Sequence, residues 1–95
     1  MNTIFDHALL ELTLCESSLA HLIREAEAEQ ESALGIFDRA LAAIPFGGSP
    51  EAYEVAGIKK RNVSALLLHL KTLARAVTQK RVLVEATAAE IAKYF

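Results

Sequence analysis

The chain has 95 residues and a mass of 10.3 kDa, which is enough for one small domain with a thin core. Hydrophobic residues make up 53% of it but aromatic residues only 6%, so the apolar side chains are mostly aliphatic, as helix packing prefers. The single cysteine excludes an intramolecular disulfide framework and a cysteine-based zinc site. A chain so rich in aliphatic residues is also not disordered.

The net charge of −2 conceals an uneven distribution along the chain. Residues 1–48 carry eight acidic and two basic side chains, whereas residues 49–95 carry eight basic and four acidic ones. Opposite charges on two halves favour their packing on each other or on a second copy. The alternative is a basic face that binds an acidic partner.

The first six residues, Met1 to Asp6, lack the basic segment of a secretory signal. The apolar run Ala65–Leu68 is far shorter than a membrane span. With the free thiol of Cys15, these features predict a cytoplasmic protein without a membrane span.

The residues that break helices are concentrated at Ile44-Pro45-Phe46-Gly47-Gly48-Ser49-Pro50. Ser49, Pro50 and Glu51 form a typical helix start, with an N-cap, a proline at the first position and an acidic residue in the first turn. We therefore predict an all-α fold within one domain, 1–95, with a helix over 4–44, a turn over 45–49 and a helix over 50–94.

Both predicted helices carry an apolar stripe with alternating spacings of four and three residues, here called the seam. In the first helix the seam consists of Phe5, Leu9, Leu12, Glu16, Leu19, Ile23, Ala26, Gln30, Ala33, Phe37, Ala40 and Ile44. In the second it consists of Ala56, Lys60, Val63, Leu67, Leu70, Ala74, Val77, Arg81, Val84, Ala88 and Ile91. This spacing, with one short connection, predicts an antiparallel helical hairpin with coiled-coil packing.

Gly35 and Gly57 each weaken a helix by about 1 kcal/mol relative to alanine, so they mark either a close approach of the helices or breaks near these positions. An uninterrupted pair of helices is the favoured alternative. With the turn near residue 47, position i of the first helix should lie near position 95 − i of the second.

Each helix has more apolar residues than one seam can hide, and leaving many leucines exposed is unfavourable. The surplus is hidden if the chain folds back at its glycines, associates with itself, or binds a partner's helix. We favour association, with a dimeric four-helix bundle as the simplest homo-oligomer. The residues predicted to bind a protein partner are Leu10, Leu14, Leu66, Leu68, Leu73 and Leu83.

Residue spacing provides little support for catalysis or for metal binding. His7, His21 and His69 make no metal-binding pair, and the run His21, Glu25 and Glu29 is interpreted as a solvated face. We expect Cys15 to be a buried structural thiol, because no base is close to it on its helix face. We predict no catalytic residue, no metal site and no cofactor.

Lys59, Lys60 and Arg61 form a modest basic cluster, which is a possible contact for an acidic ligand. Nucleic acid is an improbable ligand because the calculated pI is about 5.9 and aromatic platforms are lacking. Arg61-Asn62 followed by His69 is similar to the Arg-Asn…His signature of HEPN-type ribonucleases. Seven residues separate Arg61 from His69, whereas that signature has four to six.

The order of acidic helix, glycine-proline turn and basic-apolar helix resembles, in outline, helical-hairpin chaperones, antiactivators, small phage-encoded inhibitors and type III secretion needle subunits. The turn Pro45–Pro50 departs from the Asn/Ser/Asp-Pro pattern of the needle subunits. Our first hypothesis is a non-enzymatic interaction protein, meaning an adaptor, chaperone or inhibitor that acts through an apolar helix face. The alternatives are a structural subunit of a helical self-assembly and, less favoured, a nucleic-acid-associated regulator.

Overall fold

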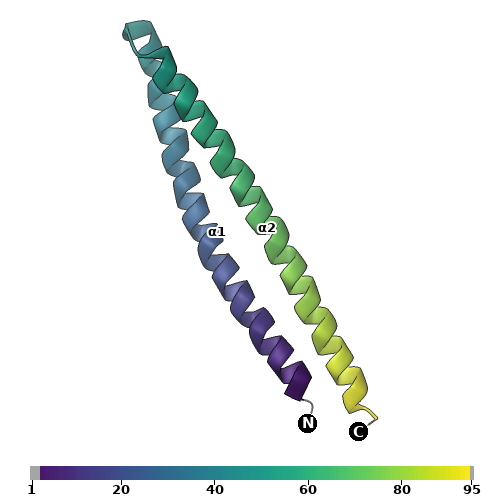
Figure 1. Cartoon of the computed structure of the whole chain (residues 1–95). Coiled ribbons are helices and arrows are strands. Elements are labelled where there is room, and N and C mark those ends of the chain that lie inside the picture. Colours follow the sequence, from purple (N-terminus) through teal and green to yellow (C-terminus); the bar gives the residue numbers. More distant parts are fainter. Residues whose placement is uncertain (1–2, 95) are drawn as a thin grey trace. The chain divides into compact units, whose positions relative to one another are not determined.

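The computed structural model describes residues 3–94, and within that range the chain is an all-α helical hairpin without strands. Helix α1 spans Thr3–Ala43, a 3-10 helix spans Ile44–Phe46, and helix α2 spans Pro50–Ala92 (Figure 1). Both long helices run without interruption through Gly35 and Gly57, so the alternative with breaks at these positions is wrong.

The predicted helix ends differ from the observed ones by at most two residues. The largest difference is at the end of α2, where Lys93 and Tyr94 form a turn although the predicted helix extends to residue 94. There the amides of Lys93 and Tyr94 donate to the carbonyls of Glu90 and Ile91, three residues back, which tightens the last turn.

The turn stops α1 with two backbone hydrogen bonds. The amide of Gly48 donates to the carbonyl of Ala43 at 2.8 Å, and that of Gly47 to the carbonyl of Ile44 at 3.3 Å. Gly47 has φ +88°, so the pattern is a Schellman motif, in which the left-handed position favours glycine. Helix α2 then begins as predicted, because the Ser49 hydroxyl accepts the Ala52 amide at 3.2 Å.

The contacts divide the chain into two compact units, which are described separately. Unit 1 combines α1 up to Leu22 with α2 from Leu70 onward, and unit 2 is the segment Ile23–His69 with the turn. In each unit a segment of α1 packs antiparallel against a segment of α2.

The predicted seam is the side of each helix that faces its neighbour. All of its positions in α1 and α2 are buried or half-buried, including the four polar residues that interrupt it. Leu19 is buried in unit 1, and Ala26, Ala33, Ala56 and Leu67 are buried in unit 2. Three of these five are alanines, so the core is thin and lets the helices of unit 2 approach closely.

The polar seam residues find partners across the seam. In unit 1, Glu16 accepts hydrogen bonds from the Arg81 guanidinium and, at 3.0 Å, from the Thr78 hydroxyl. In unit 2 the Gln30 amide donates to the Ser64 hydroxyl at 3.0 Å. The register rule places position 16 opposite 79 and position 30 opposite 65, so both contacts agree with the predicted register.

Candidate functional site

The six leucines predicted to bind a partner are all exposed, with between 51% and 62% of each residue accessible. Leu10, Leu14, Leu73 and Leu83 belong to unit 1, whereas Leu66 and Leu68 belong to unit 2. Because successive residues of a helix are about 100° apart, Leu66 and Leu68 also lie on opposite flanks of α2.

The two flanks of the seam are distinguished by their contacts. In unit 2, Glu29 and Lys59 each directly precede a seam residue, and their charged groups meet at 4.0 Å. Residues at this heptad position in antiparallel helices therefore lie on one flank. In unit 1 the equivalent residues are Ala8, Cys15 and Leu22 on α1 and Leu73, Lys80 and Thr87 on α2.

Leu10 and Leu14 lie elsewhere on unit 1. They are four residues apart and therefore adjacent on the surface of α1, on the side away from the seam. We call them the outer pair. This spacing is one that helix-in-groove recognition uses for its anchors.

The basic cluster is partly engaged by the protein itself. The Lys59 ammonium lies near Glu29, and the Lys60 ammonium lies 4.3 Å from the centre of the Phe37 ring, which is a cation–π contact. Arg61 lines a hollow beside the seam. Lys60 lines the same hollow, whereas Lys59 lies on the flank with Glu29, so only two of the three basic side chains share a surface.

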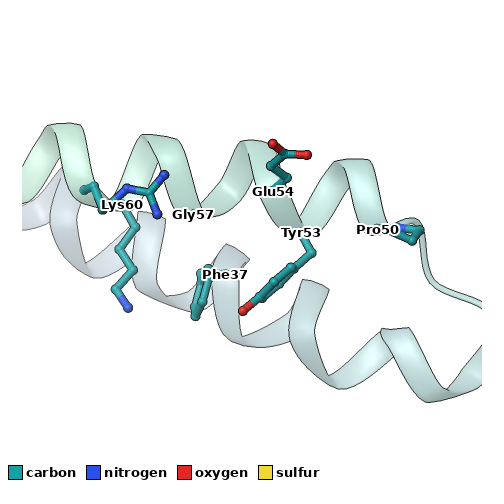
Figure 2. A pocket seen from close by; sticks show the side chains of 7 residues that line it. Phe37, Pro50, Tyr53, Glu54, Gly57 and Lys60 are labelled. Atoms are coloured by element: carbon teal, nitrogen blue, oxygen red, sulfur yellow. The ribbon is translucent and has the colours of Figure 1, made fainter.

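The hollow in unit 2 has a volume of about 510 Å³ and is open to solvent. Its aromatic wall is formed by Phe37 and Tyr53, whose ring centres lie 5.1 Å apart with a tilt of 33°. Figure 2 shows Lys60 on the opposite side of the Phe37 ring from Tyr53, with Glu54 pointing away from both rings. Pro50, Gly57 and Arg61 complete the lining.

Sequence reasoning missed this hollow although a signal for it was present. Tyr53 lies three residues before Ala56 and so extends the seam by one position. The register places position 53 opposite position 42, five residues from Phe37, so the register alone does not predict the ring contact, while the small residue at Gly57 leaves space beside the two rings.

The prediction for Cys15 is wrong, because its thiol is free and exposed. Cys15 directly precedes the seam residue Glu16, so its side chain lies on the flank rather than between the helices.

The Arg81 guanidinium, which pairs with Glu16, also donates to Glu85 at 2.7 Å. The hydrogen bonds to Glu85 and then to Glu16 raise the pKa of Arg81 above its usual value.

Arg61 and His69, the residues of the ribonuclease-like pattern, are both exposed on α2. Their positions differ by eight along one helix, which places them about 12 Å apart in the axial direction.

Among residues 3–94 no three histidine, cysteine or acidic side chains gather as metal ligands would. Within the same range, neither helix contains a stretch long and apolar enough to cross a membrane.

Comparison of the chain with protein-family models, with curated proteins and with solved structures returned no match.

Proposed function

We propose that the protein is a non-enzymatic interaction module that binds a helix of another protein through its exposed leucines. The observation that carries the proposal is the ratio of exposed to buried apolar groups. Sixteen large hydrophobic side chains among the described residues are exposed, whereas the buried core consists of two leucines and three alanines. Exposed apolar surface on this scale is typical of proteins that bury it against a partner.

The proposed contact in unit 1 is the outer pair. Burying a leucine contributes about 1.5–3 kcal/mol, and a few such anchors usually dominate the energy of a helix-in-groove interface. The proposal covers an adaptor, a chaperone or an inhibitor, since all three act by this kind of burial. It places the protein in the cytoplasm, where an exposed thiol such as that of Cys15 stays reduced.

The test begins with a photo-crosslinking amino acid at position 14 in the cells that encode the protein. The protein captured there is identified and purified, and its dissociation constant is measured by calorimetry. We expect Leu10→Asp/Leu14→Asp to weaken binding at least about 100-fold, from the loss of two buried leucines. The matched control replaces Lys59, Lys60 and Arg61 with alanine and should leave binding nearly unchanged. Circular dichroism confirms that both variants are folded.

The opposite pattern would contradict the proposal. If the alanine variant abolishes binding while the leucine variant does not, the ligand is acidic, and a steep dependence on salt would then indicate nucleic acid. A subunit of a self-assembly is the remaining alternative. It is recognised by a mass that keeps growing with concentration and by capture of this chain alone at position 14.

A further inference from the structure

The leucine flank of unit 1 is a second apolar surface, separate from the outer pair. It consists of Leu22 on α1, which is 44% exposed, with Leu73 and Leu83 on α2. Leu22 and Leu73 directly precede seam residues, and the register places position 22 opposite position 73. Leu83 also directly precedes a seam residue, Val84, so it lies on the same side of α2 but about 80° farther from the seam than Leu73. Three exposed leucines therefore share one side of unit 1.

The chain exposes more surface than a compact monomer of its mass. A folded monomer of 10.3 kDa is expected to expose about 5,400 Å². The chain exposes 7067 Å², which is about 1,700 Å² more. A standard interface buries about 800 Å² on each partner, so the excess is about twice that area and corresponds to the larger interfaces of obligate homodimers.

The charges of unit 1 indicate what covers it. The segment of α1 in this unit carries Asp6, Glu11 and Glu16 and no lysine or arginine. The segment of α2 carries four basic and two acidic side chains, which are Lys71, Arg75, Lys80, Arg81, Glu85 and Glu90. Each unit 1 thus contains an acidic helix and a basic helix side by side, and it is electrostatically complementary to a second unit 1 in which the two are exchanged.

We infer that the leucine flank binds a second copy of this chain, with α1 of each copy over α2 of the other. A two-fold axis parallel to the helices produces this arrangement, and the interface is then the same patch on both copies. It places Leu22 and Leu73 of both copies in one layer of four leucines. A two-fold axis across the helices would instead place acidic α1 on acidic α1.

This inference uses the kind of surface that the proposed function invokes, but it concerns a different patch and a different partner. The two can therefore fail independently. A dimer that binds no other protein would refute the proposed function only. A monomer that binds another protein through the outer pair would refute this inference only.

The first measurement is the mass of the full chain by sedimentation from about 1 to 100 µM. We expect twice 10.3 kDa within this range. Leu73→Glu should raise the dissociation constant at least about 30-fold, because the half-exposed leucine is lost from both copies and the new charge faces acidic α1. Leu73→Ala is a second variant that keeps the helix and should weaken the dimer in the same direction. The matched control is Leu10→Glu, an equally exposed leucine away from the flank, which should leave the mass unchanged.

The second measurement tests which helices meet. A chain with Cys15→Ser and Leu22→Cys is mixed with a chain carrying Cys15→Ser and Leu73→Cys, and the mixture is oxidised. We expect a disulfide-linked pair containing one chain of each kind. The inference is overturned by a mass of 10.3 kDa throughout, by equal weakening from Leu10→Glu and Leu73→Glu, or by a dimer that forms no cross-link between positions 22 and 73.

Discussion

The two mid-helix glycines provide a quantitative test of the packing in unit 2. A β-carbon built at Gly35 meets no heavy atom within 4 Å, and the residue lies in the interior of α1. Alanine is favoured over glycine in a helix interior by about 0.8–1.0 kcal/mol, mainly because glycine loses more backbone entropy on folding. Gly35→Ala should therefore stabilise the protein by about 0.5–1 kcal/mol, since nothing opposes the gain.

Gly57 and Gly48 serve as matched comparisons. A β-carbon at Gly57 would lie 3.4 Å from Cε2 of Phe37, so Gly57→Ala should gain less than Gly35→Ala and should narrow the hollow. At Gly48 it would lie 2.7 Å from the carbonyl carbon, the oxygen and Cβ of Ala43. Gly48→Ala should therefore destabilise the protein by about 1–3 kcal/mol, because backbone atoms of the turn must move.

Thermal unfolding followed by circular dichroism at one fixed protein concentration measures all three variants, since association would otherwise shift the melting temperature. The expected rise for Gly35→Ala is about 2–8 °C for a domain of this size. A lower melting temperature for Gly35→Ala would refute the reasoning, because it would mean that another group packs against this position. Equal effects of Gly35→Ala and Gly48→Ala would contradict the geometry of the turn.

Two further predictions concern the seam. Ala33 is only 1% exposed, so Ala33→Leu should lower the free energy of unfolding in urea by about 1–3 kcal/mol. The control, Ala28→Leu on the exposed side of α1, should change it by less than about 0.5 kcal/mol. Similar values for both variants would mean that the helices are not in close contact at Ala33. Glu16→Gln should lower the melting temperature more than Glu90→Gln does. The reason is that Glu16 is three-quarters buried against Arg81 and Thr78, whereas Glu90 pairs with Lys93 at the surface. Equal effects would show that the seam pair stabilises the fold no more than a surface pair does.

The positions of the seam could be predicted from the sequence because their spacing depends only on helix periodicity. The same stripe that predicts the hairpin is the buried stripe of the structure, including its polar interruptions. The approximate positions of the partners of Glu16 and Gln30 could also be predicted, since the register places position 16 opposite 79 and position 30 opposite 65. Combining the stripe with the register would have predicted the pair of Glu16 with Arg81, whereas Ser64 follows the seam residue Val63 and is not itself in the stripe.

Other features could not be obtained from periodicity. The exposure of Cys15 depends on which residues beside the seam are covered, and this depends on the distance between the helices. The predicted contact surface includes both Leu66 and Leu68, but the helix places them on opposite flanks. The continuity of α1 at Gly35 was also undecided, since the cost of one glycine is small beside the packing of a long helix.

The two flanks of the seam differ in how they are covered. On one flank, small residues of α2 directly follow seam residues, and larger side chains of α1 lie over them. In unit 2, Phe37 lies near Gly57 and Gln30 contacts Ser64. In unit 1, Glu16 contacts Thr78. On the other flank the corresponding residues are long and exposed, namely Leu66 in unit 2 and Leu73 in unit 1. A hairpin that functioned alone would gain nothing from this asymmetry, because exposed leucines add no stability to it. The asymmetry is advantageous if the leucine flank is buried by association, while the flank of small residues holds the two helices together.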